Sequence, residues 1–285
     1  MTSTRERQRA AARARLEKEM AERAAKARKR RQTQAIVGAA AALLLVVAGT
    51  VWLAASLGDD DKTDTAAPEA GFAQCAFTEL PADQRTKQIK DVGLPAAQQS
   101  NTGVQTMTID TNLGPITAKV DRAAVPCTAG SFTHLAEKNF FDNSKCHRLV
   151  TEGIKVLQCG DPSATGKGWR ETDGTGGPSY RLAEENLPTD KRPPYPEGVI
   201  AMANSGQPGS TGSQFFIVYG DSPLDPNYTV LGTITGGMDI VKQVAAAGDD
   251  KAFAQQAGGG HPKKEITINK LTMSAPRAST RPPRT

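Results

Sequence analysis

Short runs of apolar and β-branched residues, separated by turns rich in glycine and proline, recur along most of this chain. They cover residues 107–111, 116–120, 148–150, 156–158, 199–202, 215–219, 230–234 and 266–273. In the same region only two stretches have helical spacing, one beginning at Pro126 and one over residues 238–247. Because strands and helices do not alternate, the pattern predicts a mainly β fold: a closed antiparallel eight-stranded barrel capped by two helices.

The N-terminal part of the chain has a different composition. Residues 1–31 contain nine Arg and three Lys against four Glu, a local charge of +8, whereas the whole chain carries +5. The remaining residues therefore carry −3, and nothing in them indicates specific binding of nucleic acid. Residues 35–57 follow as 23 residues without a charge. As a helix they would span about 34 Å, enough to cross a hydrocarbon core of about 30 Å.

The charges on either side of this apolar segment indicate its orientation. Lysines and arginines precede it, and Asp59, Asp60 and Asp61 follow it. The positive-inside rule then places the N-terminus in the cytoplasm and the rest outside, in a single pass through the cell membrane. A signal anchor is favoured over a cleaved signal peptide, because the run exceeds the usual length of about 7–15 residues and no clear cleavage site follows. The alanine- and arginine-rich organisation suggests a bacterium, specifically an actinobacterium.

Six parts are expected along the chain. They are a basic cytoplasmic arm (1–34), a transmembrane signal anchor (35–57), a flexible acidic linker (58–71), an N-terminal extension of the domain (72–103), the folded domain (104–275) and a disordered tail (276–285). The linker and tail lack apolar periodicity, which is typical of segments that do not build a core.

Four cysteines lie on the predicted outer side, where disulfides persist: Cys75, Cys127, Cys146 and Cys159. Their spacing does not match a zinc site. If residues 146–150 and 156–160 pair with Arg148 opposite Gln158, Cys159 points away from the face that carries Cys146. A Cys146–Cys159 bridge is therefore not expected. Two pairings remain open, Cys127–Cys146 with Cys75–Cys159 or Cys75–Cys146 with Cys127–Cys159, and the first is slightly favoured.

Three motifs carry chemical information. They are Cys146-His147-Arg148, Leu157-Gln158-Cys159-Gly160-Asp161, and a loop of glycines and serines from residue 202 that runs into Gln214-Phe215-Phe216. Such a loop can bring backbone amides close to an extended ligand, and the strand sets an aromatic ring beside it. Together the motifs closely resemble those of the cyclophilin family of peptidyl-prolyl cis/trans isomerases, over about residues 104–273.

The resemblance implies roles for nine residues. Three would be catalytic, namely Arg148, Gln158 and Phe216, and six would bind substrate, namely Val156, Ala203, Asn204, Gln214, Leu224 and Tyr228. Arg148 would donate a hydrogen bond to the prolyl region, and Gln158 would orient it or bind a substrate carbonyl. Phe216 would form the floor of a proline socket. Rotation about the amide needs neither a nucleophile nor a metal, so no cofactor and no metal are expected.

Some positions depart from the family pattern. The segment between Arg148 and Gln158 is longer, so that Val156 would replace a methionine and Ile154 or Lys155 would stand at a phenylalanine position. Pro223 stands at a tryptophan position and Tyr228 at a histidine position, which predicts weak binding of cyclosporin. His147 is interpreted as a structural histidine, and the glycine-rich residues 173–178 as close backbone packing.

The sequence thus predicts a membrane-anchored, extracytoplasmic and monomeric isomerase. Its partners would be proline-containing segments of secreted or cell-surface proteins. The alternative is a module or chaperone of the same fold that binds proline segments with little turnover. A serine hydrolase is disfavoured, because Ser210 and Ser213 lie in no G-x-S-x-G elbow.

Overall fold

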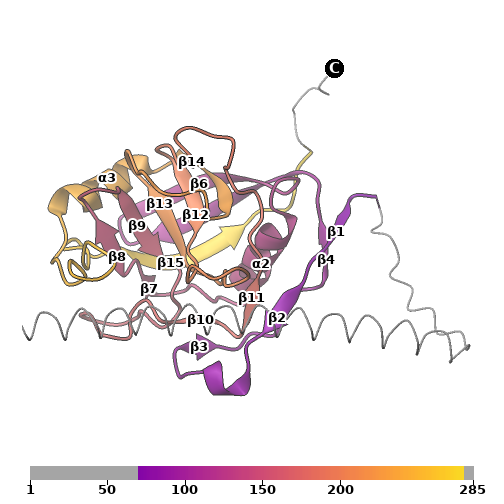
Figure 1. Ribbon diagram of the computed structural model, residues 1–285, viewed down its shortest axis with the longest axis horizontal. Coiled ribbons are helices and arrows are strands. Elements are labelled where there is room, and N and C mark those ends of the chain that lie inside the picture. The colour runs from indigo at the N-terminus through magenta and orange to yellow at the C-terminus, as the bar shows by residue number, and fades with distance from the viewer. Residues whose placement is uncertain (1–69, 279–285) are drawn as a thin grey trace, which may run out of the picture. The chain divides into compact units, whose positions relative to one another are not determined.

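A nine-stranded antiparallel sheet is the centre of the computed structural model, which describes residues 70–278 (Figure 1). Its spatial order is β7-β15-β5-β6-β14-β12-β13-β9-β8. The strands are β5 (Val104–Thr111), β6 (Gly114–Asp121), β7 (Ser144–Lys145), β8 (Arg148–Val150), β9 (Val156–Cys159), β12 (Val199–Met202), β13 (Phe215–Val218), β14 (Val230–Gly236) and β15 (Thr267–Met273). The mainly β fold with two helices is confirmed.

The prediction of a closed eight-stranded barrel is wrong, because the sheet curls but stays open between β7 and β8. Loop segments occupy the outer sides of both edge strands. Leu149 of β8 exchanges two backbone hydrogen bonds with Gly260, at 2.8 and 3.0 Å, and Lys145 of β7 donates one to Ala164. With these groups already paired, no ladder forms between the two edges.

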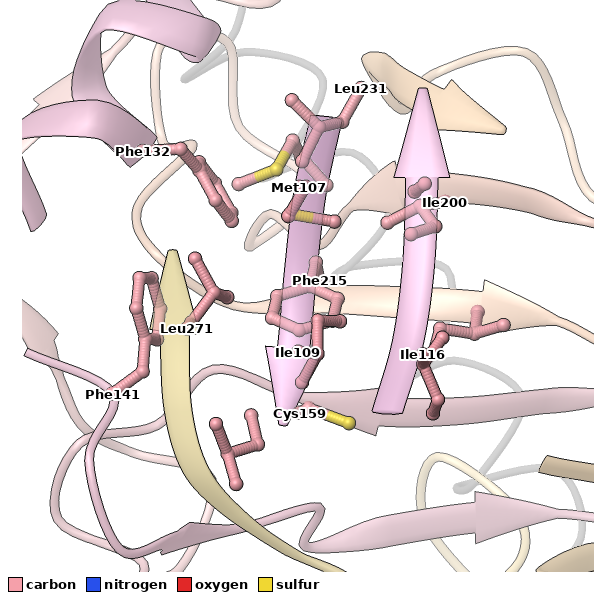
Figure 2. Close-up of a cluster of buried hydrophobic side chains, with 14 of the residues drawn as sticks. Met107, Ile109, Ile116, Phe132, Phe141, Cys159, Ile200, Phe215, Leu231 and Leu271 are labelled. Carbon is pink, nitrogen blue, oxygen red and sulfur yellow. The ribbon is translucent and has the colours of Figure 1, made fainter. Parts of the chain in front are cut away.

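The alternation of side chains along the strands divides the buried residues into two clusters. On β13, Phe215 and Ile217 belong to the main core, whereas Phe216 and Val218 belong to a second cluster on the other face. Figure 2 shows Phe215 in the main core beside Phe132 of helix α2 (Pro126–Glu137). The ring centroids of Phe132 and Phe215 lie 5.9 Å apart. The sheet thus buries one face beneath α2 and leaves Phe216 for the other face.

Both predicted helices form. Helix α2 has Pro126 at its first position, where the missing N–H costs nothing. Helix α3 (Met238–Ala247) buries Val241 and Val244 and begins after Gly237, whose φ is +83°. A Cβ at Gly237 would lie 2.5 Å from the carbonyl oxygen of Pro115, so the chain needs glycine there.

The N-terminal extension forms one two-stranded sheet of its own and joins the domain through two others. Its elements are β1 (Phe72–Gln74), β2 (Phe77–Glu79), the 3-10 helix η1 (Ala82–Gln84), β3 (Ile89–Lys90) and β4 (Gln98–Ser100). β1 pairs with β4, whereas β2 pairs with β11 (Tyr180–Leu182) and β3 with β10 (Gly177–Pro178). A disulfide between Cys75 and Cys127 ties the extension to α2.

Both expected cysteine pairings are wrong. The second disulfide joins Cys146 to Cys159, whose Cα atoms lie 3.9 Å apart. The predicted register, with Arg148 opposite Gln158, is correct. However, Cys146 does not belong to β8. Its N–H donates to the carbonyl of Ile266, the residue directly before β15, so Cys146 is paired with that part of the chain. The alternation of side chains along β8 therefore does not extend back from Arg148 to Cys146. The side chains of Cys146 and Cys159 both lie in the main core.

Within residues 70–278, no helix is both long and apolar enough to cross a membrane. The predicted cytoplasmic arm, anchor and most of the acidic linker lie outside the described residues, as does the end of the predicted tail.

Candidate active site

A cavity of about 530 Å³ opens on the face of the sheet that carries Phe216. We call it the main cavity. Of the nine predicted site residues, eight line it: Arg148, Val156, Gln158, Ala203, Asn204, Phe216, Leu224 and Tyr228. The ninth, Gln214, lines an adjoining cavity. The structure therefore brings together residues from five separate segments of the chain.

Strand register aligns the three predicted catalytic side chains in one row. Arg148 on β8 lies opposite Gln158 on β9, and Gln158 lies opposite Phe216 on β13. Because paired residues point to the same face of a sheet, all three side chains reach the main cavity. The row follows from local alternation once the three strands pair.

A chain of hydrogen bonds fixes the polar end of this row. Arg148 Nη1 donates to Gln158 Oε1 at 3.0 Å, and Gln158 Nε2 donates to Gln214 Oε1 at 2.9 Å. Gln214 Nε2 in turn donates to the carbonyls of Gly174 and Gly176, at 2.8 and 2.9 Å. Gln214 thus supports Gln158, which orients the guanidinium.

The apolar end of the main cavity is built from aromatic rings. Phe216 is 6% exposed, and the ring of Tyr228 stands edge-on to it with centroids 5.4 Å apart. Tyr195, which sequence reasoning missed, packs beneath both rings and donates its hydroxyl to the carbonyl of Tyr228 at 2.9 Å. Ile154 lines the main cavity and Lys155 does not. Of these two residues, Ile154 therefore stands at the phenylalanine position of the family pattern.

The strand-end residues Ala203 and Asn204 provide backbone groups. Ala203 N–H donates to the Gln214 carbonyl at 2.9 Å, and the Asn204 side chain donates to the Asn227 carbonyl at 2.9 Å. The backbone N–H and C=O of Asn204 have no partner among residues 70–278. They are free to pair with an extended chain laid across the main cavity.

A loop that sequence reasoning missed covers the other side of Arg148. Arg148 Nε donates to Gly258 at 3.1 Å and Nη2 donates to the carbonyl of Ala257. Phe253 from the same loop lines the main cavity. The three consecutive glycines 258–260 were the sequence feature that could have indicated this close approach. At Gly259, φ is +73° and a Cβ would lie 2.0 Å from the carbonyl oxygen of Leu149. Burial lowers the pKa of the Arg148 guanidinium, but an arginine stays charged in proteins.

His147 is buried, in agreement with its interpretation as a structural histidine. It is 3% exposed, and a Cβ at Gly174 would lie 2.9 Å from its ring. Burial lowers the pKa of His147 to about 4, against the opposing charges of Asp161 and Asp173. Asp161 accepts hydrogen bonds from the N–H groups of Gly174 and Gly176, at 2.6 and 3.1 Å. The glycine-rich segment is therefore packed closely by its backbone, as predicted.

No group of three or more histidine, cysteine, aspartate or glutamate side chains within the described range could hold a metal ion. The main cavity offers one charged fork, amide groups, free backbone groups and an apolar floor. Such a site can bind an extended chain and hold an apolar ring against Phe216, with a charged donor close by.

Comparisons with known proteins point to one family. Residues 106–273 match the family model described as "Cyclophilin type peptidyl-prolyl cis-trans isomerase/CLD". A probable peptidyl-prolyl cis-trans isomerase B of Mycobacterium leprae is 42% identical over 206 residues, which are 67% of this chain and 64% of the relative. This chain thus spans less than two thirds of that curated relative.

Some shorter relatives are covered almost completely. A peptidyl-prolyl cis-trans isomerase of Dictyostelium discoideum is 33% identical over 59% of this chain and 97% of its own length. The crystal structure of a cyclophilin type isomerase from Cryptosporidium parvum superposes with a TM-score of 0.50 and 25% identity, covering 60% of this chain and 98% of that one.

Proposed function

This chain belongs to the cyclophilin-type peptidyl-prolyl cis-trans isomerase family, and on that premise we propose that it accelerates the isomerisation of X-Pro bonds in other proteins. The substrate would be an extended segment with its proline ring on Phe216. No covalent intermediate is involved, because the reaction only rotates one amide bond.

The physical task is to stabilise a twisted amide. Amide resonance sets a barrier of about 18–20 kcal/mol, so a catalyst must bind the twisted form better than either planar form. Twisting returns a lone pair to the prolyl nitrogen, and a cationic donor close to that nitrogen stabilises it. Arg148 supplies this donor, while the rings of Phe216 and Tyr228 exclude water from the prolyl side.

One observation carries the proposal: the Arg148 guanidinium stands over the same cavity whose floor is Phe216, held by Gln158. A guanidinium has five N–H groups, of which three are used for Gln158, Ala257 and Gly258. The other two N–H groups have no partner within residues 70–278 and remain for the substrate. The donor is thus both fixed in place and still able to donate.

The same contacts favour a second candidate function. Because the carbonyls of Ala257 and Gly258 hold part of the Arg148 guanidinium, the donor could be too constrained to follow a rotating amide. The chain would then bind proline segments with little turnover, as a chaperone does. The altered segment that contains Ile154 and Val156 is consistent with this reading too.

Exchange spectroscopy by NMR on a proline-containing peptide separates the two functions. We expect the full-length chain, in mild detergent, to accelerate exchange and Arg148→Ala to reduce the acceleration about 100-fold or more, as for loss of one key donor. Arg277→Ala, which removes an exposed arginine outside the main cavity, is the matched control. Binding without acceleration by the wild-type chain would support the binding module. Unchanged acceleration in Arg148→Ala would remove Arg148 from the mechanism.

The proposal extends to location: a single-pass anchor at residues 35–57 would hold the domain outside the cell membrane of an actinobacterium. Its clients would be secreted or cell-surface proteins, and it would act as a monomer. Support comes from the uncharged segment and from two disulfides, which persist in oxidising compartments. Protease added to intact cells should then remove the domain but spare an N-terminal tag. A domain that is protected in intact cells and digested after lysis would contradict this location.

A further inference from the structure

A second cavity of about 570 Å³ continues the main cavity. We call it the side cavity. The two share Gln158, Gly174, Ala203 and Asn204, so one extended ligand can reach both. Much of the remaining lining is small or uncharged: Thr175, Gly176, Gly177, Ser205, Gly209, Ser210, Gly212 and Ser213.

Among the described residues, Arg181 is the one charged residue that lines the side cavity. Its Nη1 donates to the carbonyls of Pro178 and Tyr180, at 2.9 and 2.7 Å, which fixes the guanidinium. Its Nε and Nη2 have no hydrogen-bond partner in the described part of the chain, and no carboxylate there lies within 4.0 Å of it. Burial lowers the pKa of Arg181, and no nearby anion opposes that effect. The cavity thus holds a fixed cation with unused donors.

Glu184, the acidic residue nearest to Arg181 along the chain, forms hydrogen bonds with other residues. The carboxylate of Glu184 accepts hydrogen bonds from the Gly209 N–H at 2.9 Å and from the Thr211 hydroxyl at 3.1 Å. It therefore holds the loop that forms one wall of the side cavity, and within residues 70–278 Arg181 forms no ion pair.

Two glycines keep the Arg181 guanidinium open to a ligand. A Cβ at Gly177 would lie 3.7 Å from Arg181 Nη1, and one at Gly212 would lie 3.5 Å from the same atom. At both distances a Cβ would already touch the guanidinium, so the two glycines leave this part of it uncovered. The N-terminal extension closes the far wall with Leu80 and Gln84. The side cavity is therefore a polar recess that carries one positive charge, with residues of the N-terminal extension in its wall.

The geometry of an extended ligand links this recess to the reaction. Alternate side chains of an extended chain point to the same side, about 7 Å apart for residues i and i+2. With its proline ring in the main cavity, a substrate directs the residue two positions away toward the side cavity. The backbone groups of Asn204 lie on the wall that both cavities share.

We propose that Arg181 selects substrates with an acidic side chain two residues before the proline. This inference rests on the proposed isomerase function, with the proline ring on Phe216. In it we assign the residues that precede the proline to Ala203, Asn204 and Gln214, which the resemblance implies as substrate-binding. A carboxylate matches the unused donors of the guanidinium fork, whereas a lysine side chain is repelled.

The test compares acetyl-Glu-Ala-Pro-Phe-amide with acetyl-Gln-Ala-Pro-Phe-amide in NMR exchange, on the full-length chain. We expect kcat/KM to favour the glutamate peptide about fivefold, the size of a partly exposed ion pair. Arg181→Gln should bring the ratio close to one, and Arg181→Lys, which keeps the charge without the fork, should give an intermediate ratio. Lys119→Gln makes the same change in net charge at an exposed position on β6 and should keep the wild-type ratio.

Several results would overturn the proposal. They are equal rates for the two peptides in the wild type, an unchanged ratio in Arg181→Gln with a wild-type circular dichroism spectrum, or the same preference when glutamate is placed two residues after the proline. If neither peptide is isomerised at all, the isomerase function fails. The same pair of peptides in isothermal titration calorimetry then tests the acidic preference by binding alone.

Discussion

Protonation of His147 should destabilise the fold well above the pH at which most proteins unfold in acid. The imidazole is 3% exposed, and its Nδ1 has no hydrogen-bond partner within residues 70–278. Burial lowers its pKa to about 4 from an ordinary value of 6.5. Asp161 and Asp173 act in the opposite direction, whereas Arg148 and His261 add to the lowering. The folded chain therefore prefers the neutral ring.

The magnitude follows from proton linkage. Because the pKa in the folded state is lower than in the unfolded state, the contribution of His147 is complete above pH 6.5 and is lost as pH falls toward 4. The gap between the two pKa values, at 1.36 kcal/mol for each pKa unit, sets a limit of about 3 kcal/mol. About 2 kcal/mol of this should be lost between pH 7.5 and pH 5.

Urea unfolding of the full-length chain at several pH values measures this loss. His147→Gln cannot take up the proton, so its free energy of unfolding should fall less over the same range, by about 2 kcal/mol at pH 5. A direct titration of the His147 ring by NMR checks the cause. The reasoning is refuted if wild type and His147→Gln lose stability in parallel, or if the ring titrates near pH 6.5.

Three further outcomes are expected. Phe216→Ala should abolish measurable isomerisation and cost about 3 kcal/mol of stability, at the low end for a phenylalanine because the ring faces an open cavity; both are read from exchange rates and urea curves. Replacing Cys75 and Cys127 together by serine should lower stability by about 4 kcal/mol, since the bridge spans 52 residues, and an unchanged melting temperature would contradict this. Tyr195→Phe should cost about 1–3 kcal/mol, because the hydroxyl bonds both the N–H and the C=O of Tyr228, and a cost below 0.5 kcal/mol would show that water replaces it.

The facing pair of Arg148 and Gln158 could be predicted because it depends on local rules. Alternation along each strand fixes which side chains share a face, and the short segment between β8 and β9 sets their register. β13 pairs with β9 across a long stretch of chain, so the place of Phe216 beside them was expected from the resemblance to the family alone. The motifs then indicated which face carries the site. The strands β5 and β6 and the two helices followed from periodicity in the same way.

The parts that were missed depend on contacts between distant segments. The alternation that excluded the Cys146–Cys159 bridge holds within a strand and fails at the bend before Arg148. The loop that carries Phe253 has no periodic pattern of apolar residues. Its own sequence therefore did not predict that it packs against Arg148. Arg181 was missed for a related reason: its cavity exists only where the extension, β11 and a distant loop meet.

The position of β15 in the sheet sets the order in which a newly made chain can fold. This strand, Thr267–Met273, lies between β5 and β7 and pairs with both, although it is the last strand along the chain. Until it has been synthesised, β5 exposes an unpaired edge and β7 has no neighbour in the sheet. The domain therefore cannot be completed progressively during synthesis. β15 must leave the ribosome before the sheet can be completed, and its pairing with β5 joins segments far apart in the chain, a kind of contact that forms slowly.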